Sequence, residues 1–195
     1  MKSLVCCFRT NEKKLSTNSA VYELLVKFPY FKNYVDLTRL ELGAIQAVQQ
    51  DRICNIAFIG SGPLPLSSLQ LSHTLPGDVK VMNIDHDPTA ISQSKNLCAR
   101  LETRGMGMEF SCKEAGACDL RKFDVVYLEA LVGCEQEEKE RMIVETTANM
   151  REGSILLIRS AHGLRRVLYA VSENPFLGKD GWLTRSRHST RLQRR

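Results

Sequence analysis

Residues 58–65, FIGSGPLP, decide the fold of this chain, because they join an apolar run to a helix-like segment through a loop with two glycines. Gly60 and Gly62 permit a tight turn and let the backbone approach a ligand closely. Pro65 suits the first turn of the helix that follows. Strand, glycine loop and helix in this order are the context of a nucleotide-binding loop. The predicted ligand-binding residues of the loop are Gly60, Ser61, Gly62 and Pro63.

Strand-like and helix-like segments alternate around this loop. Short apolar runs predict strands at 53–59, 79–84, 108–112, 124–128 and 154–158. Segments with helical patterning lie at 65–74, 88–103, 136–149 and 163–172. This alternation predicts an α/β fold with a doubly wound, mostly parallel, Rossmann-like sheet. A complete sheet of this class has two further strands, which the sequence does not reveal, so we expect its last strands to be missing.

The segments outside the alternation divide the chain into three parts. Helices are expected at about 19–28 and at 33–50, and Asn33 or Asp36 is expected to cap the second one. We predict a partial N-terminal helical region at 1–50, a Rossmann-like domain at 51–174 and a basic, disordered tail at 175–195. The apolar stripe of the second helix consists of Leu37, Leu40, Ala44, Ile45 and Val48.

The charge of the chain comes from its last residues. The net charge is +5, and five of the 27 basic residues are arginines among the last eleven positions, which hold no acid. Without them the chain has 22 basic and 22 acidic residues. Such a tail can touch nucleic acid or anionic lipid. Because no aromatic residues are interleaved with the arginines, we expect a solvated end and no nucleic-acid partner.

Cysteine usage and hydropathy bear on the compartment. The seven cysteines include no CxxC pair, which disfavours a zinc site and fits a reducing compartment. No apolar run approaches the roughly 20 residues of a membrane span. The apolar stretch near the N-terminus is too short for a signal peptide. We therefore predict a cytoplasmic protein with no membrane partner and no metal bound by the chain.

Two acids follow the predicted second and third strands. Asp85 lies 25 positions after Gly60, where an acid can accept hydrogen bonds from both ribose hydroxyls. Asp87 is better placed to cap the next helix, and the alternative is that both acids only cap. Glu114 is the candidate to meet an adenine amino group, or else it is an ordinary loop carboxylate. The third glycine of the dinucleotide fingerprint is absent, which favours an adenosine ligand without phosphates over a nicotinamide cofactor.

Three collinear segments resemble the nicotianamine synthase family. They are NYVDLTRLE at 33–41, FIGSGPLPLS at 58–67, and ALVG at 130–133 together with LIRSAHG at 157–163. The resemblance covers about residues 28–169. It implies a transferase that takes S-adenosylmethionine as substrate and moves its 3-amino-3-carboxypropyl group. The family condenses three S-adenosylmethionine molecules into nicotianamine and releases methylthioadenosine, so the metal belongs to the product.

The resemblance assigns catalytic roles to four residues. Glu41 lies on the apolar stripe of its helix, and a carboxylate there would accept the proton of the attacking amine. The alternative for Glu41 is a residue at the edge of the stripe, or one paired with a distant arginine. Tyr34, on the same face, would hydrogen-bond the substrate or simply pack. Arg159 would hold a substrate carboxylate, and His162 would orient the substrate or move a proton. For both residues the alternative is a cap or core contact.

Family members are generally larger than this chain. They carry an N-terminal helical domain that covers the pocket and more sheet after the RSAHG segment. We therefore expect an exposed sheet edge and marginal stability, unless a second copy or a completing partner covers the fold. The alternatives to nicotianamine synthesis are an S-adenosylmethionine-dependent methyltransferase, which would form S-adenosylhomocysteine, and a catalytically inactive paralogue.

Overall fold

A computed structural model of the chain describes residues 20–49, 51–101, 107–129, 131–133, 135–159 and 167–170. Its centre is a six-stranded sheet in the order β3-β2-β1-β4-β5-β6. The strands are β1 (Asn55–Ile59), β2 (Lys80–Asp85), β3 (Met108–Cys112), β4 (Val125–Leu128), β5 (Ile155–Ile158) and β6 (Val167–Ala170). The helices are α1 (Ala20–Val26), α2 (Phe31–Val48), α3 (Leu66–Thr74), α4 (Pro88–Arg100), η2 (Ala115–Ala117) and α5 (Gln136–Ala148).

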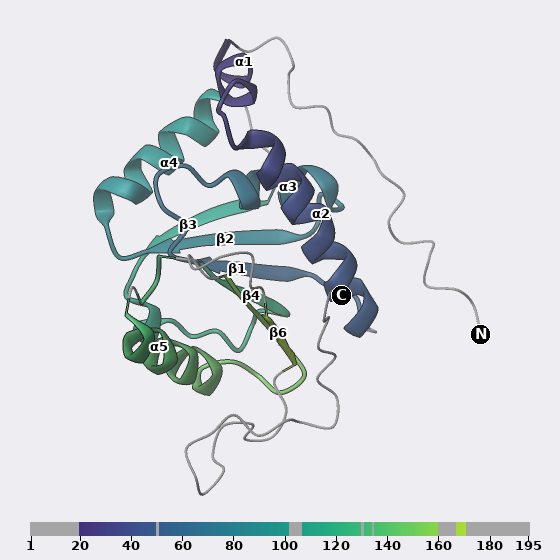
Figure 1. Cartoon of the computed structure of the whole chain (residues 1–195), viewed down its shortest axis with the longest axis vertical. Helices are drawn as coiled ribbons and strands as arrows, with labels where there is room; N and C mark the ends of the chain where they lie inside the picture. Colours follow the sequence, from purple (N-terminus) through teal and green to yellow (C-terminus); the bar gives the residue numbers. More distant parts are fainter. Residues whose placement is uncertain are drawn as a thin grey trace, which may run out of the picture.

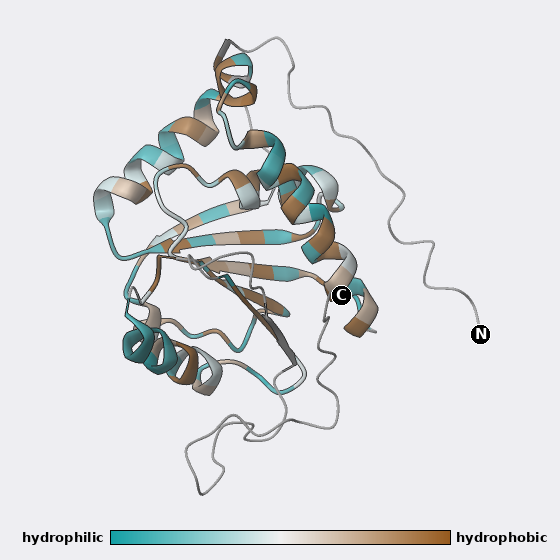
Figure 2. Ribbon diagram, in the orientation of Figure 1, coloured by the Kyte–Doolittle hydropathy of each residue, from teal (hydrophilic) through white to brown (hydrophobic). Residues whose placement is uncertain are grey.

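The helices cover the two faces of the sheet unequally (Figure 1). On one face α2 and α3 pack over β1, β4 and β5, through Ile45, Leu71 and Phe58 among others. The α1 and α4 helices extend this layer over β2 and β3. On the other face η2 and α5 pack over alternate residues of the same strands, such as Ile59 and Leu128. The strands are mostly hydrophobic and α5 is largely hydrophilic, as Figure 2 shows.

The first five strands are parallel, as predicted, because each connection returns over a face of the sheet. Their carboxyl ends therefore form one edge of the sheet. The chain order reverses between β1 and β4, and ligands of open α/β sheets bind beside such a reversal. The glycine loop follows β1 and so lies at this point.

Three details of the sequence prediction are wrong. Residues 167–170 form β6, antiparallel to β5, where a helix and no further strand were expected. The α2 helix begins at Phe31 after Tyr30, so Asn33 and Asp36 lie inside it and cannot cap its start. Its buried face is also rotated from the predicted stripe: Leu40 is 58% exposed, whereas Phe31, Thr38, Glu41, Leu42 and Ile45 are buried.

Residues 1–19 of the predicted helical region lie outside the described part of the chain, as do the predicted boundary between residues 174 and 175 and the predicted tail at 175–195. Within that part, no helix combines the length and hydropathy needed to cross a lipid bilayer.

Candidate active site

The glycine loop is tied to the carboxyl end of β2 by its own backbone. The amides of Gly60 and Ser61 donate to the carbonyl of Ile84 at 2.8 and 3.1 Å. The amide of Gly62 donates to Oδ2 of Asp85 at 2.8 Å, and Oδ1 accepts from the amide of Asp87 at 3.0 Å. The buried Asp85 carboxylate therefore shapes the loop, with lone pairs left for a ligand.

The capping role predicted for Asp87 is confirmed. Its side chain accepts from the amide of Thr89 at 2.8 Å, and Pro88 opens the α4 helix. Asp87, and not Asp85, therefore caps α4. Asp85 lies at the end of β2, beside the glycine loop. Its predicted contact with a ribose remains a proposal.

Both loop glycines adopt backbone conformations that favour glycine. Gly60 has φ +77° and Gly62 has φ +66°. A Cβ atom on Gly60 would collide with the side chain of Val132, whereas one on Gly62 would meet nothing within 4 Å. Val132 belongs to the ALVG segment at 130–133, so that segment packs directly against the loop. Among the described residues, the space beside Gly62 is open.

The start of α5 holds the ALVG segment in place. The Nζ atom of Lys139 donates to the carbonyl of Glu129 at 2.6 Å and to that of Val132 at 2.7 Å. Gly133, with φ +68°, lies so close to the backbone of Lys139 that a Cβ atom would be 2.7 Å from it. Residues 131–133 therefore connect the carboxyl end of β4 with the glycine loop.

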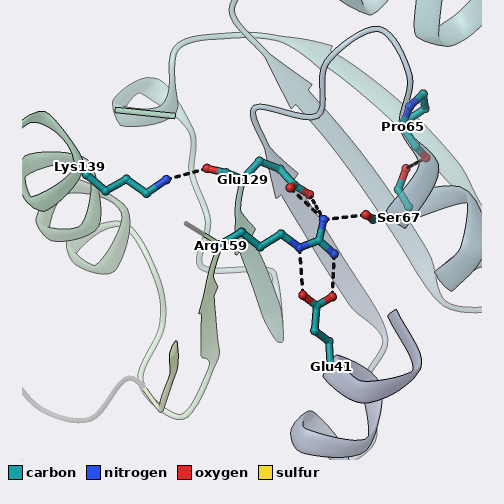
Figure 3. A network of polar contacts seen from close by, with 7 residues as sticks. Glu41, Pro65, Ser67, Glu129, Lys139 and Arg159 are labelled. Carbon is teal, nitrogen blue, oxygen red and sulfur yellow. Dashed lines mark hydrogen bonds and ion pairs between the residues drawn. The ribbon is translucent and has the colours of Figure 1, made fainter. Parts of the chain in front are cut away.

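Glu41 and Arg159 form a buried ion pair beside Ser67, which follows this loop at the start of α3 (Figure 3). Nε of Arg159 donates to Oε1 of Glu41 at 3.0 Å, and Nη2 donates to Oε2 at 2.6 Å. The two side chains are 3% and 7% exposed. This two-bonded geometry is the strong form of an arginine–carboxylate pair. Pairing with a distant arginine was the alternative reading of Glu41, and it holds in this structure.

A second carboxylate and a hydroxyl occupy the other side of the same guanidinium. Nη1 of Arg159 donates to Oε1 and Oε2 of Glu129 at 2.8 and 2.9 Å. It also donates to Oγ of Ser67 at 2.6 Å. Ser67 is the second residue of α3 and closes the GSGPLPLS motif. The cluster therefore joins α2, α3, β4 and β5 at the carboxyl edge of the sheet.

The sheet register explains why Glu129 and Arg159 meet. Tyr127 pairs with Leu157 and Leu128 with Ile158, so the next two residues, Glu129 and Arg159, are neighbours. Side chains alternate along a strand, which places both on the α2 face with Tyr127. Tyr127 stacks on Phe58 with ring centroids 4.3 Å apart. The guanidinium carbon of Arg159 lies 5.3 Å from the centre of the Tyr127 ring.

Burial and charge compete in this cluster. Burial opposes the charge of Arg159, but Glu129 and Glu41 outweigh it and raise the pKa of the guanidinium above its ordinary value. Burial raises the pKa of Glu129, and Arg159 partly offsets that effect. Burial, and next the charge of Glu41, raise the pKa of Tyr127, so its phenol stays neutral. The cluster thus places two carboxyl groups around one guanidinium in a site that is largely shielded from solvent.

The other predicted residues lie farther from this cluster. Tyr34 is half-buried on α2 and packs against the apolar cluster of α1, α3 and α4. Glu114 is exposed, just before η2, and follows the strand whose Cys112 pairs with Asp85. His162 lies outside the described residues. Pro63 is exposed at the tip of the glycine loop, and the Ser61 hydroxyl finds no hydrogen-bond partner among the described residues.

Sequence reasoning missed Ser67 and the pairing of Glu129 with Arg159. The alternation of β4 and β5 was a usable signal for that pair, because both residues directly follow in-register strands. For Ser67 we see no local signal beyond its place in the motif. Within the described part of the chain, no group of three or more histidine, cysteine or acidic residues could hold a metal ion.

Comparison with known proteins identifies relatives over most of the chain. The family model described as nicotianamine synthase protein matches residues 9–184. Nicotianamine synthase 9 of Hordeum vulgare is 37% identical over 161 residues, which is 81% of this chain and 47% of that protein. Nicotianamine synthase 3 of Arabidopsis thaliana is 38% identical over 149 residues, 75% of this chain and 47% of that one. The chain therefore spans about half the length of these relatives.

Solved structures agree in fold. The crystal structure of a mutant of MtNAS in complex with S-adenosylmethionine matches with a TM-score of 0.59 and 24% identity, over 70% of this chain and 49% of that one. MtNAS in complex with MTA and tNA matches equally well, with a TM-score of 0.59. These likenesses show the fold of the chain.

Proposed function

The chain belongs to the nicotianamine synthase family, and we propose that it takes part in condensing S-adenosylmethionine into nicotianamine with release of methylthioadenosine. The observation that carries this proposal is the Glu41 carboxylate, which is 3% exposed and is held by Arg159, a residue that also contacts Ser67 of the glycine-loop motif. A carboxylate rarely lies so deep without a partner or a task. Here it has a fixed partner and lies beside the loop proposed to bind the substrate.

The loop and Asp85 would bind the nucleoside part of S-adenosylmethionine. Close approach is possible at Gly62, where no neighbouring atom lies within 4 Å of a Cβ position. The Asp85 carboxylate, already aligned by the amides of Gly62 and Asp87, would accept bonds from the ribose hydroxyls. Glu114 is our candidate for the adenine amino group. Ser61 and Pro63, which belong to the same loop, would also contact the nucleoside.

The reaction requires an amine that has lost a proton. The nitrogen lone pair attacks the carbon bonded to the sulfonium, a nitrogen–carbon bond forms, and the carbon–sulfur electron pair stays on sulfur as methylthioadenosine leaves. Glu41 would accept the proton released by the amine. Each Glu41 oxygen accepts one bond from Arg159, which fixes the position of the carboxylate. The negative site also favours the sulfonium cation of the substrate.

We propose less specific roles for Tyr34, His162 and Arg159 in binding the substrate. Tyr34 and His162 would contact the substrate amine or carboxylate. Arg159 would hold a substrate carboxylate, although Glu41, Glu129 and Ser67 already accept bonds from all three of its nitrogens. We further propose a reducing, cytoplasmic setting, since the exposed Cys54 and Cys112 are not joined in disulfides.

The test is mass spectrometry of purified protein incubated with S-adenosylmethionine. Methylthioadenosine together with nicotianamine is the expected result, lost in Glu41→Gln and retained in Glu137→Gln, whose side chain is exposed on α5. Formation of S-adenosylhomocysteine would instead establish a methyltransferase. Folded protein that binds S-adenosylmethionine but yields no product would contradict turnover by this chain.

A further inference from the structure

We propose that Glu129 is a positioning residue that keeps Arg159 neutralised while Glu41 takes the proton of the substrate amine. This inference rests on the proposed function. It concerns a partly buried acid, Glu129, to which neither the motif nor the reaction chemistry gives a role. Glu129 does not touch the reacting atoms in this scheme and acts through Arg159.

The geometry places Arg159 between two acids that come from different elements (Figure 3). Glu41 lies on a helix and binds Nε and Nη2, whereas Glu129 directly follows β4 and binds Nη1. Glu129 is fixed at both backbone atoms: its amide donates to Ile59 at 3.0 Å and its carbonyl accepts from Lys139 at 2.6 Å. The guanidinium therefore has one acid anchored to the sheet and one on the covering helix.

A charge count shows what the second acid does. Glu41, Glu129 and Arg159 carry a net charge of about −1 when both acids are ionised. When Glu41 takes a proton, the cluster becomes neutral and Arg159 keeps Glu129 as its partner. Without Glu129 the cluster would start neutral, and protonation of Glu41 would leave a buried, unpaired guanidinium. An unpaired buried charge is strongly disfavoured, so Glu41 would be a poor base.

Among the described residues, the other side chains that contact Arg159 or Glu129 do not provide this second negative charge. Tyr127 faces it from β4 as a neutral phenol. Lys139 faces Glu129 from α5 as a cation, and Ser67 faces Arg159 from α3 as a hydroxyl. Ser67 is therefore a matched control, because it accepts a bond from the same Nη1 atom as Glu129 without carrying charge.

The experiment compares Glu129→Gln with Ser67→Ala in the rate of methylthioadenosine release across pH. We expect Glu129→Gln to lower the maximal rate by up to about tenfold, since the base loses strength. Its acid limb should move to lower pH by about one unit, because Arg159 then acts on Glu41 alone. Ser67→Ala should leave the acid limb in place. Equal rate losses with unchanged limbs in both variants would overturn the proposal.

A second measurement separates this inference from the proposed function and from folding. Carbon-13 NMR of protein labelled at the glutamate side-chain carboxyls follows titration without turnover, with the Glu41 signal assigned from Glu41→Gln. In variants that keep the wild-type far-UV circular dichroism, the Glu41 titration should move to lower pH in Glu129→Gln and not in Ser67→Ala. A wild type that releases no methylthioadenosine refutes the function. An unmoved Glu41 titration refutes the role of Glu129.

Discussion

Replacing Arg159 by methionine should lower the free energy of unfolding by an amount that can be estimated from the structure. The change keeps most of the side-chain volume and removes the cation that Glu41 and Glu129 share. Removal of one partner from a buried ion pair costs about 3–5 kcal/mol, because it leaves uncompensated charge. The side chains of Glu41 and Glu129 are only 3% and 17% exposed, so hydration would stabilise their charges little after the arginine is removed.

The loss should depend on pH in a specific direction. Burial raises the pKa of Glu129, and Arg159 opposes this, so the variant raises that pKa further. A carboxyl whose pKa is higher folded than unfolded contributes stability below its unfolded pKa. That contribution is lost as pH rises through the folded pKa. The deficit of the variant should therefore be largest at alkaline pH and shrink as pH falls and Glu129 takes up a proton.

Urea unfolding followed by far-UV circular dichroism measures the effect. With a slope of about 2 kcal/mol per M, the midpoint should fall by about 2 M at pH 7.5. Arg121→Met is the control, since Arg121 pairs with Asp119 on the surface and should tolerate the change without measurable loss. A deficit under about 1 kcal/mol, or one that grows as pH falls, would refute the reasoning.

Three other variants distinguish the glycine loop from the supporting sheet. Gly60→Ala should cost more stability than Gly62→Ala in the same urea assay, because only the first brings a Cβ atom against Val132. Gly62→Ala should lose about 1–2 kcal/mol from its left-handed backbone alone, and equal losses would contradict this. Asp124→Ala should cost about 2–4 kcal/mol, since its side chain accepts from two backbone amides and from Arg151. Asp124 directly precedes β4, whereas the candidate site lies at the other end of that strand. Calorimetry should therefore show unchanged S-adenosylmethionine affinity in Asp124→Ala. A tenfold loss of affinity would contradict this expectation.

The sheet was predictable because its central strands are buried on both faces. The apolar runs ending at Ile59 and Leu128 needed no long-range information, and the two ends agree with the structure. The error at 167–170 has a physical origin, since four apolar residues fit a strand or a helix turn equally well. Leu40 was misplaced because Thr38 and Glu41 occupy buried positions of α2 that an apolar pattern cannot include.

The candidate site was predictable only in part. Glu41 was identifiable because a charged residue on an apolar helix face is unusual. Its partner lies 118 positions away, and no local pattern links the two. The choice between catalysis and ion pairing was therefore left open by the sequence, and the structure shows that the pair exists. Gly60 was chosen for its φ angle, but its contact with Val132 depends on tertiary packing.

The place of β1 in the sheet has a consequence for the newly made protein. Its first neighbour, β2, follows within about thirty residues of chain, whereas the second, β4, comes later: Asn55 and Asp124, at the starts of β1 and β4, are 69 positions apart. At roughly 5–20 residues per second, the ribosome needs about 4–14 s to supply that partner. During those seconds a buried strand presents an open edge, which can pair with another chain. In crowded synthesis, β1 is the segment from which aggregation would start.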